Sequence, residues 1–340
     1  KVVYRRHTNF SLESIQQTFN GNASLGNRVT AQISRNGDLI HKMYVVADVT
    51  ASGAADSYAG LKLLKKVELE IGGQLIDRQY AEWMYVWNEL SLPQGKVDGY
   101  KTMVGNAMTA TNGSAGDGVH KLYIPLEFWF CRNVGLALPL IALQYHEVKV
   151  NIEFETGTEM TNLTMNSAEL WVDYIFLDTD ERRRFAQMSH EYLIEQVQFT
   201  GSETITSSAN KIKLNFNHPV KEIVWVSHAS GAWNNFDVVD NVKLQLNGND
   251  RFAERGADYF SLVQPYQHHE RIPAGQNINV YAFGLKPEEH QPSGTLNMSR
   301  IDTATLHCTG TSATASLSVY AVNYNVLRIL SGMGGLAYSN

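Results

Sequence analysis

The sequence predicts an all-β protein built from two similar β-sandwiches in tandem. Three observations point to this class: segments in which apolar and polar residues alternate, turn signals between those segments, and an internal repeat. The chain has 340 residues, more than one hydrophobic core usually serves, so two domains are expected. Apolar residues make up 44%, charged residues 18%, and there are 26 glycines, which fits a globular protein with many loops.

Alternation is the main signal for strands. In residues 148–154, for example, every second residue is apolar, so one face of the segment is apolar and the other polar. The same pattern occurs at residues 29–33, 67–71, 212–216, 242–246 and 317–321. Turn-forming residues separate these segments, as at Asn36-Gly37-Asp38, Gly72-Gly73, Asn247-Gly248 and Pro273-Ala274-Gly275. We therefore expect half-buried antiparallel strands.

One segment follows helical spacing instead. Tyr80, Trp83, Met84, Trp87 and Leu90 recur every three or four residues, which predicts a short helix over residues 79–91. An aromatic stripe of this kind is more often the packed face of a helix than a cofactor site.

Residues 93–120 show little periodicity. They contain six glycines with several Thr and Asn residues. Because glycine loses much backbone entropy on ordering, this segment is predicted to be a long solvent-facing loop of the first domain.

The chain also repeats itself in order. Phe19-Asn20-Gly21 recurs as Phe199-Thr200-Gly201, and the segment 67–73 recurs as 242–248. Asp77-Arg78 recurs as Asp250-Arg251, and the segment 138–141 aligns with 297–301. Shared order favours a duplicated β-domain.

The expected seam lies near residues 178–190, where charges cluster, giving domains at residues 1–182 and 183–340. An eight-stranded jelly-roll needs roughly 150–180 residues, so two of them, with a few short helices, fill the chain.

The charge pattern disfavours direct nucleic-acid binding. The formal net charge is -6, and the densest basic run, Arg182-Arg183-Arg184, follows Asp178, Asp180 and Glu181. A nucleic-acid site normally presents a basic face, so this run is interpreted as a solvated, internally paired corner.

Two buried free thiols are expected at Cys131 and Cys308, which lie far apart in apolar surroundings. No apolar run reaches the roughly 18 residues of a membrane span, and no signal peptide is visible. The chain starts at Lys1, without Met, inside a patterned segment, so a preceding N-terminal arm is expected.

No motif predicts catalysis, a cofactor or a metal. His268-His269-Glu270 is the most metal-like cluster, but adjacent histidines on an extended segment point to opposite sides, so a solvated loop is predicted. His146-Glu147 and His190-Glu191 lack the spacing of a zinc protease and are interpreted as structural hydrogen-bonding residues. We therefore expect no enzyme activity.

Two further features concern modification and the C-terminus. Asn112, in the glycine-rich segment, is the glycosylation candidate among five Asn-x-Ser/Thr triplets, the others being at Asn9, Asn22, Asn162 and Asn297. The segment Leu327–Tyr338 is apolar and glycine-rich, and Gly332–Gly335 is interpreted as a turn that lets it pack closely. It is expected to dock on its own domain or on a neighbouring subunit.

Several long strings resemble the major capsid proteins of nucleocytoplasmic large DNA viruses, with the chlorella virus (phycodnavirus) protein as the nearest likeness. They include Gly135-Leu-Ala-Leu-Pro-Leu-Ile-Ala-Leu-Gln-Tyr-His-Glu-Val148 and Trp171-Val-Asp-Tyr-Ile-Phe-Leu-Asp178. The others are Val3–Phe10, Glu13–Gln17, Ile33–Leu39, His190–Gln196 and Asn323–Tyr338. The resemblance covers nearly the whole chain.

The resemblance implies a structural shell protein with a double jelly-roll fold. It implies homotrimers that form pseudo-hexameric capsomers and tile an icosahedral capsid with neighbouring capsomers, minor capsid proteins and penton proteins. It places the inner face near a viral membrane, in a virion assembled in the host cytoplasm. The segments His228–Asp240 and Cys308–Ser316 are shorter than the family's loops there, so no glycan site is transferred.

Two other functions stay open from the sequence, because jelly-rolls also host lectins and cupins. A glycan-binding module is the first, and a metal-dependent enzyme is the second. A stable trimer would favour the capsid protein, and stoichiometric bound metal would favour the enzyme.

Overall fold

The computed structural model describes residues 3–5, 7–108, 118–229 and 233–339. The first half holds two sheets. One has the order β1-β10-β4-β7, with β8 paired to β4; its strands are β1 (Phe10–Gln17), β4 (Leu39–Ala51), β7 (Val119–Pro125), β8 (Leu138–Pro139) and β10 (Leu163–Leu177). The other has the order β2-β3-β9-β5-β6, from β2 (Phe19–Asn20), β3 (Arg28–Gln32), β5 (Lys66–Ile71), β6 (Gln74–Tyr80) and β9 (Val148–Glu153).

The second half repeats this plan. One sheet has the order β11-β20-β14-β17, from β11 (His190–Phe199), β14 (Pro219–His228), β17 (Asn279–Ala282) and β20 (Ala315–Leu330). β12 (Glu203–Ile205) and β21 (Met333–Leu336) pair with β20, and β18 (Leu296–Asn297) pairs with β14. The other sheet has the order β13-β19-β15-β16, from β13 (Ala209–Leu214), β15 (Val239–Leu246), β16 (Asn249–Asp250) and β19 (Ala304–Gly310).

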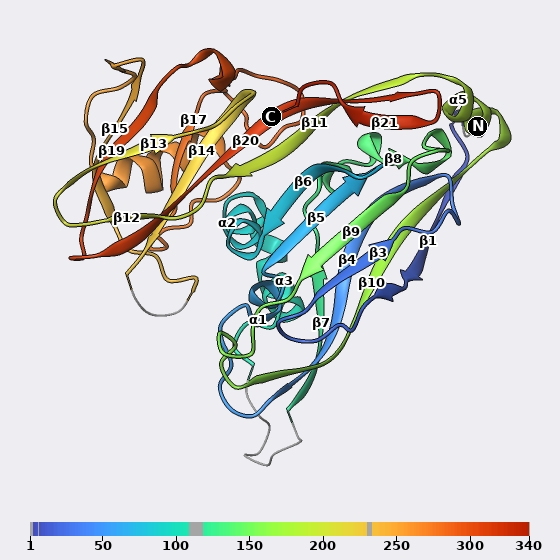
Figure 1. The fold of residues 1–340 in the computed structure, drawn as a ribbon, viewed down its shortest axis with the longest axis horizontal. Coiled ribbons are helices and arrows are strands. Elements are labelled where there is room, and N and C mark those ends of the chain that lie inside the picture. Colours follow the sequence, from blue (N-terminus) through green and yellow to red (C-terminus); the bar gives the residue numbers. More distant parts are fainter. Residues whose placement is uncertain (1–2, 6, 109–117, 230–232, 340) are drawn as a thin grey trace.

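The two halves therefore have the same topology. When the short strands β2, β8, β12, β18 and β21 are left aside, each half has eight strands. The first, eighth, third and sixth of these form one sheet, and the second, seventh, fourth and fifth form the other. This is the arrangement of a jelly-roll, a sandwich of two Greek keys. The predicted all-β double jelly-roll is confirmed, and Figure 1 shows the two lobes.

The repeated strings occupy equivalent places in the two halves. Gly21 and Gly201 follow the first strand of each half with φ values of +102° and +107°. Gly72-Gly73 and Asn247-Gly248 make the turn after the fourth strand, and both residues of each turn have positive φ. Positive φ at both central residues is the requirement of a tight type I′ hairpin turn, which explains why Gly and Asn recur there.

The described helices are short. They are α1 (Ala59–Leu63), α2 (Ala81–Ser91), α3 (Val97–Met103), α4 (Trp129–Arg132), α5 (Thr179–Gln187) and α6 (Gln264–His268), with π-helix η5 (Tyr259–Val263). The 3₁₀ turns are η1 (Gln94–Lys96), η3 (Val134–Leu136), η4 (Leu140–Ala142) and η6 (Met298–Arg300). The helix predicted over 79–91 is confirmed by α2.

The prediction of an exposed loop over residues 93–120 is wrong for most of its described part. Residues 94–103 form η1 and α3, and Val97, Tyr100 and Val104 are buried. These three residues have helical spacing, which the intervening glycines hide. Gly60 packs against this segment, because a Cβ there would lie 2.8 Å from the Val104 carbonyl oxygen. Residues 109–117 lie outside the described part of the chain.

Two large hydrophobic cores, with a small third cluster of Leu39, Ala137 and Ile175, hold the described part of the fold together. The second half has its own core between its two sheets, around Trp225, Leu244 and Phe260. The larger core fills the first half and continues into the second, where it includes Val224 and Tyr320. The β11-β20-β14-β17 sheet is therefore buried on both faces, and α2 lies in the junction between the lobes (Figure 1).

The C-terminal segment docks within its own chain. β21 pairs with β20, and a Cβ at Gly334 would lie 2.6 Å from Leu143 of the first half. The Leu336 amide donates to the Gln74 side chain at 3.1 Å. The close packing predicted for Gly332–Gly335 is confirmed, but the predicted turn is wrong beyond Gly332, because residues 333–335 belong to β21. The tail ties the two halves together. Within the described residues, no helix is long and apolar enough to cross a bilayer.

Candidate functional site

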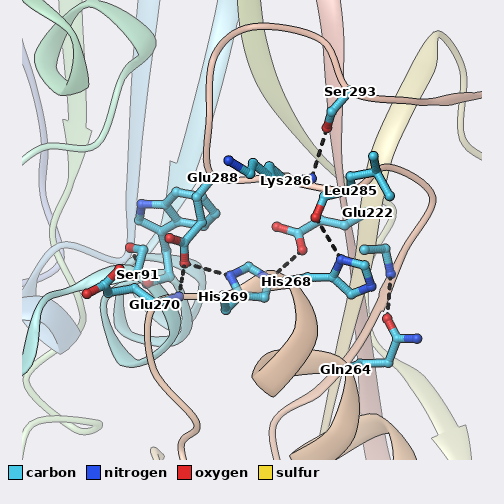
Figure 2. A network of polar contacts seen from close by, with 12 residues as sticks. Ser91, Glu222, Gln264, His268, His269, Glu270, Leu285, Lys286, Glu288 and Ser293 are labelled. Carbon is cyan, nitrogen blue, oxygen red and sulfur yellow. Dashed lines mark hydrogen bonds and ion pairs between the residues drawn. The ribbon is translucent and has the colours of Figure 1, made fainter.

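The His268-His269-Glu270 cluster lies at the end of α6, and the prediction of a solvated loop is wrong for His269. Its side chain is fully buried. Figure 2 shows it between two carboxylates: Nε2 lies 2.6 Å from Glu222 and Nδ1 lies 2.8 Å from Glu288. His268 points elsewhere, with Nδ1 2.9 Å from the Leu285 carbonyl oxygen.

The two carboxylates decide the charge of His269. Burial alone lowers the pKa of an imidazole, but the charges and hydrogen bonds of Glu222 and Glu288 raise the pKa of His269 to about 9. The ring is therefore a cation at neutral pH and donates from both nitrogens. Since both nitrogens are engaged, neither has a lone pair for a metal, and this cluster is a buried ion network.

A second buried ion network lies beside it. Lys221 Nζ lies 2.6 Å from Glu195, whose other oxygen is 3.1 Å from Arg132. Burial raises the pKa of Glu195, but Arg132, His290 and Lys221 together lower it to about 2. Arg132 belongs to the first half and Glu195 to the second, so this network crosses the junction.

Further polar contacts fix how the two halves meet. Glu82 of α2 accepts from Tyr320 at 2.8 Å and lies 2.5 Å from His228 Nε2. The Val197 amide donates to Asp77 at 3.2 Å, and burial raises the pKa of this carboxyl to about 6. Because these groups are directional, the junction has one preferred geometry rather than a general apolar contact.

Sequence reasoning missed Glu222, Glu195 and Lys221. A signal was present, because Lys221-Glu222 stands within an otherwise apolar run that ends in Ile223-Val-Trp-Val226. Charges inside such a run are buried and must be paired.

The other histidines and the arginine run singled out in the sequence make structural contacts, as predicted. His146 Nδ1 lies 2.9 Å from the Gly334 carbonyl oxygen, and His190 Nε2 lies 2.8 Å from that of Phe185. Arg182 pairs with Asp38 at 3.0 Å and Arg184 with Glu181 at 3.5 Å, so the predicted paired corner is confirmed.

The two thiols are free and buried, as predicted. Burial raises the pKa of Cys131, and it raises that of Cys308 to about 11, so both are protonated and unreactive at neutral pH. Over the described ranges, no three His, Cys, Asp or Glu side chains are grouped so that they could hold a metal ion.

The glycosylation triplets differ in accessibility. Asn112 lies outside the described residues. The Asn162 amide donates to the Ala54 carbonyl oxygen at 2.9 Å, and the Asn297 side chain accepts from the Ser299 amide at 3.1 Å. Asn9, Asn22 and Asn162 are exposed, whereas Asn297 is half-buried.

The exposed apolar residues gather in a few places. Phe10 and Leu12 stand on β1, which is an edge strand of its sheet. Tyr123 stands on β7, on the outer face of the same sheet. Leu262 and Val263 of η5 and Tyr266 of α6 are exposed on the second half, as is Leu285, whose carbonyl oxygen contacts His268 at the end of α6. Exposed apolar patches on a stable fold commonly mark protein interfaces.

The jelly-roll is a fold of viral capsid proteins, lectins and cupins, and two jelly-rolls joined by a buried polar junction suit a structural protein. Residues 1–178 match the family of the major capsid protein N-terminus, and residues 181–335 match that of the large eukaryotic DNA virus major capsid protein. The chain therefore belongs to the family of major capsid proteins of nucleocytoplasmic large DNA viruses.

Individual relatives agree. The chain is 58% identical to the major capsid protein of Pyramimonas orientalis virus over 372 residues, covering 100% of this chain and 93% of that protein. It is 43% identical to the major capsid protein of Paramecium bursaria Chlorella virus 1 over 416 residues, covering 100% and 94%. Both alignments are longer than the 340 residues of this chain, so the relatives carry additional loop residues.

Solved structures give the same result. The crystal structure of PBCV-1 VP54, fitted into a reconstruction of the virophage Sputnik, matches with a TM-score of 0.90 and 42% identity, covering 100% of this chain and 99% of that one. The Faustovirus major capsid protein shares the fold with a TM-score of 0.83 at 14% identity. The protein is thus a structural component of the virion capsid, and its relatives are shell proteins, not enzymes.

Proposed function

We propose that three copies of this chain form a closed capsomer with a pseudo-hexagonal outline, and that capsomers tile an icosahedral shell. The observation that carries this proposal is the repeated strand order of the two halves. Two similar sandwiches in each chain give three chains six similar units, which suits a threefold particle to a hexagonal lattice. Closed cyclic symmetry also leaves no subunit with an unmatched face inside the particle.

The domains that serve this role are residues 1–182 and 183–340. Support comes from the sheets, because no described strand of one half pairs with a strand of the other. The boundary falls inside α5, whose Arg182 pairs back to Asp38. Hydrogen exchange offers a test: α5 should exchange faster than β10 and β11, whereas equal protection would argue for another boundary.

Further partners follow from the family. We expect contacts with neighbouring capsomers, minor capsid proteins and penton proteins, an inner face near a viral membrane, and assembly in the host cytoplasm. The net charge of -6 and the paired arginines of α5 support an absence of direct nucleic-acid binding. Asn112 stays the glycosylation candidate, which intact-mass measurement on virions would test.

Sedimentation and electron microscopy test the capsomer. The purified protein should sediment at three times the chain mass of 38.0 kDa and should show threefold particles with a hexagonal outline. Obligate interfaces commonly bury about 2,000 Å² or more, so the trimer should persist at micromolar concentration. A stable monomer at that concentration would rule the proposal out.

A further inference from the structure

The β13-β19-β15-β16 sheet of the second half has one face that the chain itself does not cover. Ile212, Leu244 and Leu306 of this sheet point into the second core, and none of its residues belongs to the larger core that fills the junction. In Figure 1 the sheet lies on the side of the second lobe away from the first half. We call its other face the outer sheet face.

Basic side chains stand in a row across the outer sheet face. His307 of β19 is opposite Lys211 of β13 on one side and opposite Lys243 of β15 on the other. Because side chains alternate between the two faces of a sheet, Lys213 stands on the same face as Lys211. Partial burial and the charges of Lys243 and Lys211 lower the pKa of His307, against the opposing charge of Asp250. The row is therefore crowded with positive charge.

Little of this charge is neutralised within the chain. Over the described residues, the ion pairs of this sheet comprise only Lys243 with Asp250, at 3.6 Å. Asp250 also accepts from the Gln245 side chain at 2.7 Å. Lys211 and Lys213 are both exposed. The outer sheet face therefore keeps a net positive charge, although the formal charge of the whole chain is -6.

The equivalent sheet of the first half is arranged differently. There Lys66 of β5 stands opposite Glu153 of β9, and Lys149 of β9 stands opposite Glu70 of β5. The first of these pairs closes at 3.3 Å. Opposite charges on neighbouring strands stabilise a sheet, whereas like charges destabilise it. The second half thus accepts a loss of stability that the first half avoids, which indicates that an anionic partner supplies the missing charge.

The other side chains of the face narrow the class of partner. Thr305 stands opposite Lys213 and Gln245, so a hydroxyl and an amide lie beside the charges. Strands β13, β15 and β19 contain no Phe, Tyr or Trp, and none of the exposed large apolar side chains lies on them. Protein interfaces centre on aromatic and apolar anchors, and single-stranded nucleic acids stack on aromatic rings. A hydrated polymer with negative charges and hydroxyl groups fits this face better than either.

We propose that the outer sheet face binds an anionic polysaccharide. Lys211, Lys213 and Lys243 contact its sulfate or carboxylate groups, and Thr305 contacts its hydroxyl groups. Jelly-rolls are also a fold of lectins, so the sheet is a suitable scaffold for a sugar polymer. Because the chain as a whole is acidic, most of its surface repels a polyanion, and the attraction has to come from this face. The proposal adds a binding function to the shell protein.

Equilibrium binding of defined polymers to the untagged full-length protein tests the proposal. Dextran sulfate and polygalacturonate distinguish sulfate from carboxylate groups, and unmodified dextran is the neutral probe. We expect saturable binding of at least one polyanion, weakening as salt is added because exposed charges are screened, and no binding of dextran. Replacing Lys211, Lys213 and Lys243 together by Gln should weaken binding at least about tenfold. The matched control replaces Lys65, Lys66 and Lys149 of the first half by Gln, removes the same charge, and should bind like the wild type.

Single substitutions and competing polymers complete the test. Lys211→Gln changes one exposed side chain and serves if the triple variant does not fold; it should weaken binding relative to Lys149→Gln. Undiminished binding by the variants of the second half, or an equal loss in the controls, would overturn the site. Polyglutamate or duplex DNA that binds as tightly as the polysaccharides would overturn the class of partner. Failure to bind either polysaccharide would overturn the inference and leave the trimer, which sedimentation measures separately, untouched.

Discussion

Two sheets at equivalent positions in the duplicated fold have different surroundings. The β11-β20-β14-β17 sheet is buried on both faces, and residues 220–227 of β14 are all buried. The β1-β10-β4-β7 sheet has one open face, and exposed or half-buried residues alternate with buried ones along much of β4 and β10. The difference shows that the same topology serves both as a sheet buried between two cores and as a sheet with one face in contact with water.

Burial on both faces changes what the strands must contain. Where both faces are covered, most residues are apolar and the buried charges are paired, as with Lys221 against Glu195 and Glu222 against His269. On the open face, Asp48 pairs with Lys121 at 3.7 Å while both remain accessible to water. Substitutions on the two sheets should therefore have very different effects.

The largest loss of stability is expected when the contact between α2 and the β11-β20-β14-β17 sheet is disrupted. Trp83→Ala removes the ring that packs on Tyr320 and leaves a cavity in the junction. We expect a loss of about 3–5 kcal/mol in unfolding free energy, as for other buried tryptophans. Denaturation at fixed protein concentration measures it, with Tyr145→Ala as an exposed control expected within about 0.5 kcal/mol. A Trp83→Ala protein as stable as the control would show that α2 does not hold the two halves together.

Two substitutions on β11 compare the stability lost with a buried ion pair and the stability lost with an exposed ion pair. Glu195→Gln leaves Lys221 buried without its counter-ion, and we expect a loss of about 3–5 kcal/mol. Glu191→Gln breaks the exposed pair with Arg328, four residues earlier on the strand, and should cost no more than about 1 kcal/mol. Equal effects would contradict the buried network.

Acid should weaken the same network. The pKa of Glu195 is depressed to about 2, below its ordinary value of 4.5. Its stabilisation is therefore present above pH 4.5 and is lost as the pH falls through 2. Thermal midpoints of wild-type protein and Glu195→Gln should converge over that range.

At alkaline pH, His269 gives the opposite dependence. Its pKa of about 9 lies above the ordinary 6.5, so its contribution is complete below pH 6.5 and is lost as the pH rises through 9. The linked change is about 3 kcal/mol by the pKa difference. His269→Gln should be less stable than wild type at pH 6 and should approach it above pH 9. Parallel profiles for the two proteins would mean that His269 is not a buried cation.

Much of this fold could be predicted from the sequence because alternation, turns and repeats are local patterns. The repeat is recognisable at Gly72-Gly73 and Asn247-Gly248, because the equivalent turns both need residues that accept positive φ. The helix α2 followed from the spacing of its aromatic residues. The resemblance of long strings then indicated the family.

The rest depends on contacts that no local pattern encodes. The ends of the His269 network, Glu222 and Glu288, are far apart in sequence and meet only through the fold. The helix α3 was missed because its two buried residues, Val97 and Tyr100, stand beside Gly99, which lowers helix propensity. The sequence signal for the covered sheet is the unbroken apolar run Ile223–Val226, because a strand buried on both faces is apolar at successive positions.

The smallest effect expected concerns the tail, the second tie between the covered sheet and the first half. A Cβ at Gly334 would lie 2.6 Å from Leu143 and 3.3 Å from Ile71, both fully buried and unable to move away. Gly334→Ala should therefore cost about 1–3 kcal/mol by overpacking. Gly335→Ala is the matched control, because its nearest neighbour is the flexible Gln74 side chain at 3.3 Å. Deleting residues 331–340 should lower the thermal midpoint further yet leave the protein trimeric, since the tail docks within its own chain. A folded monomer after this deletion would instead place the tail between subunits.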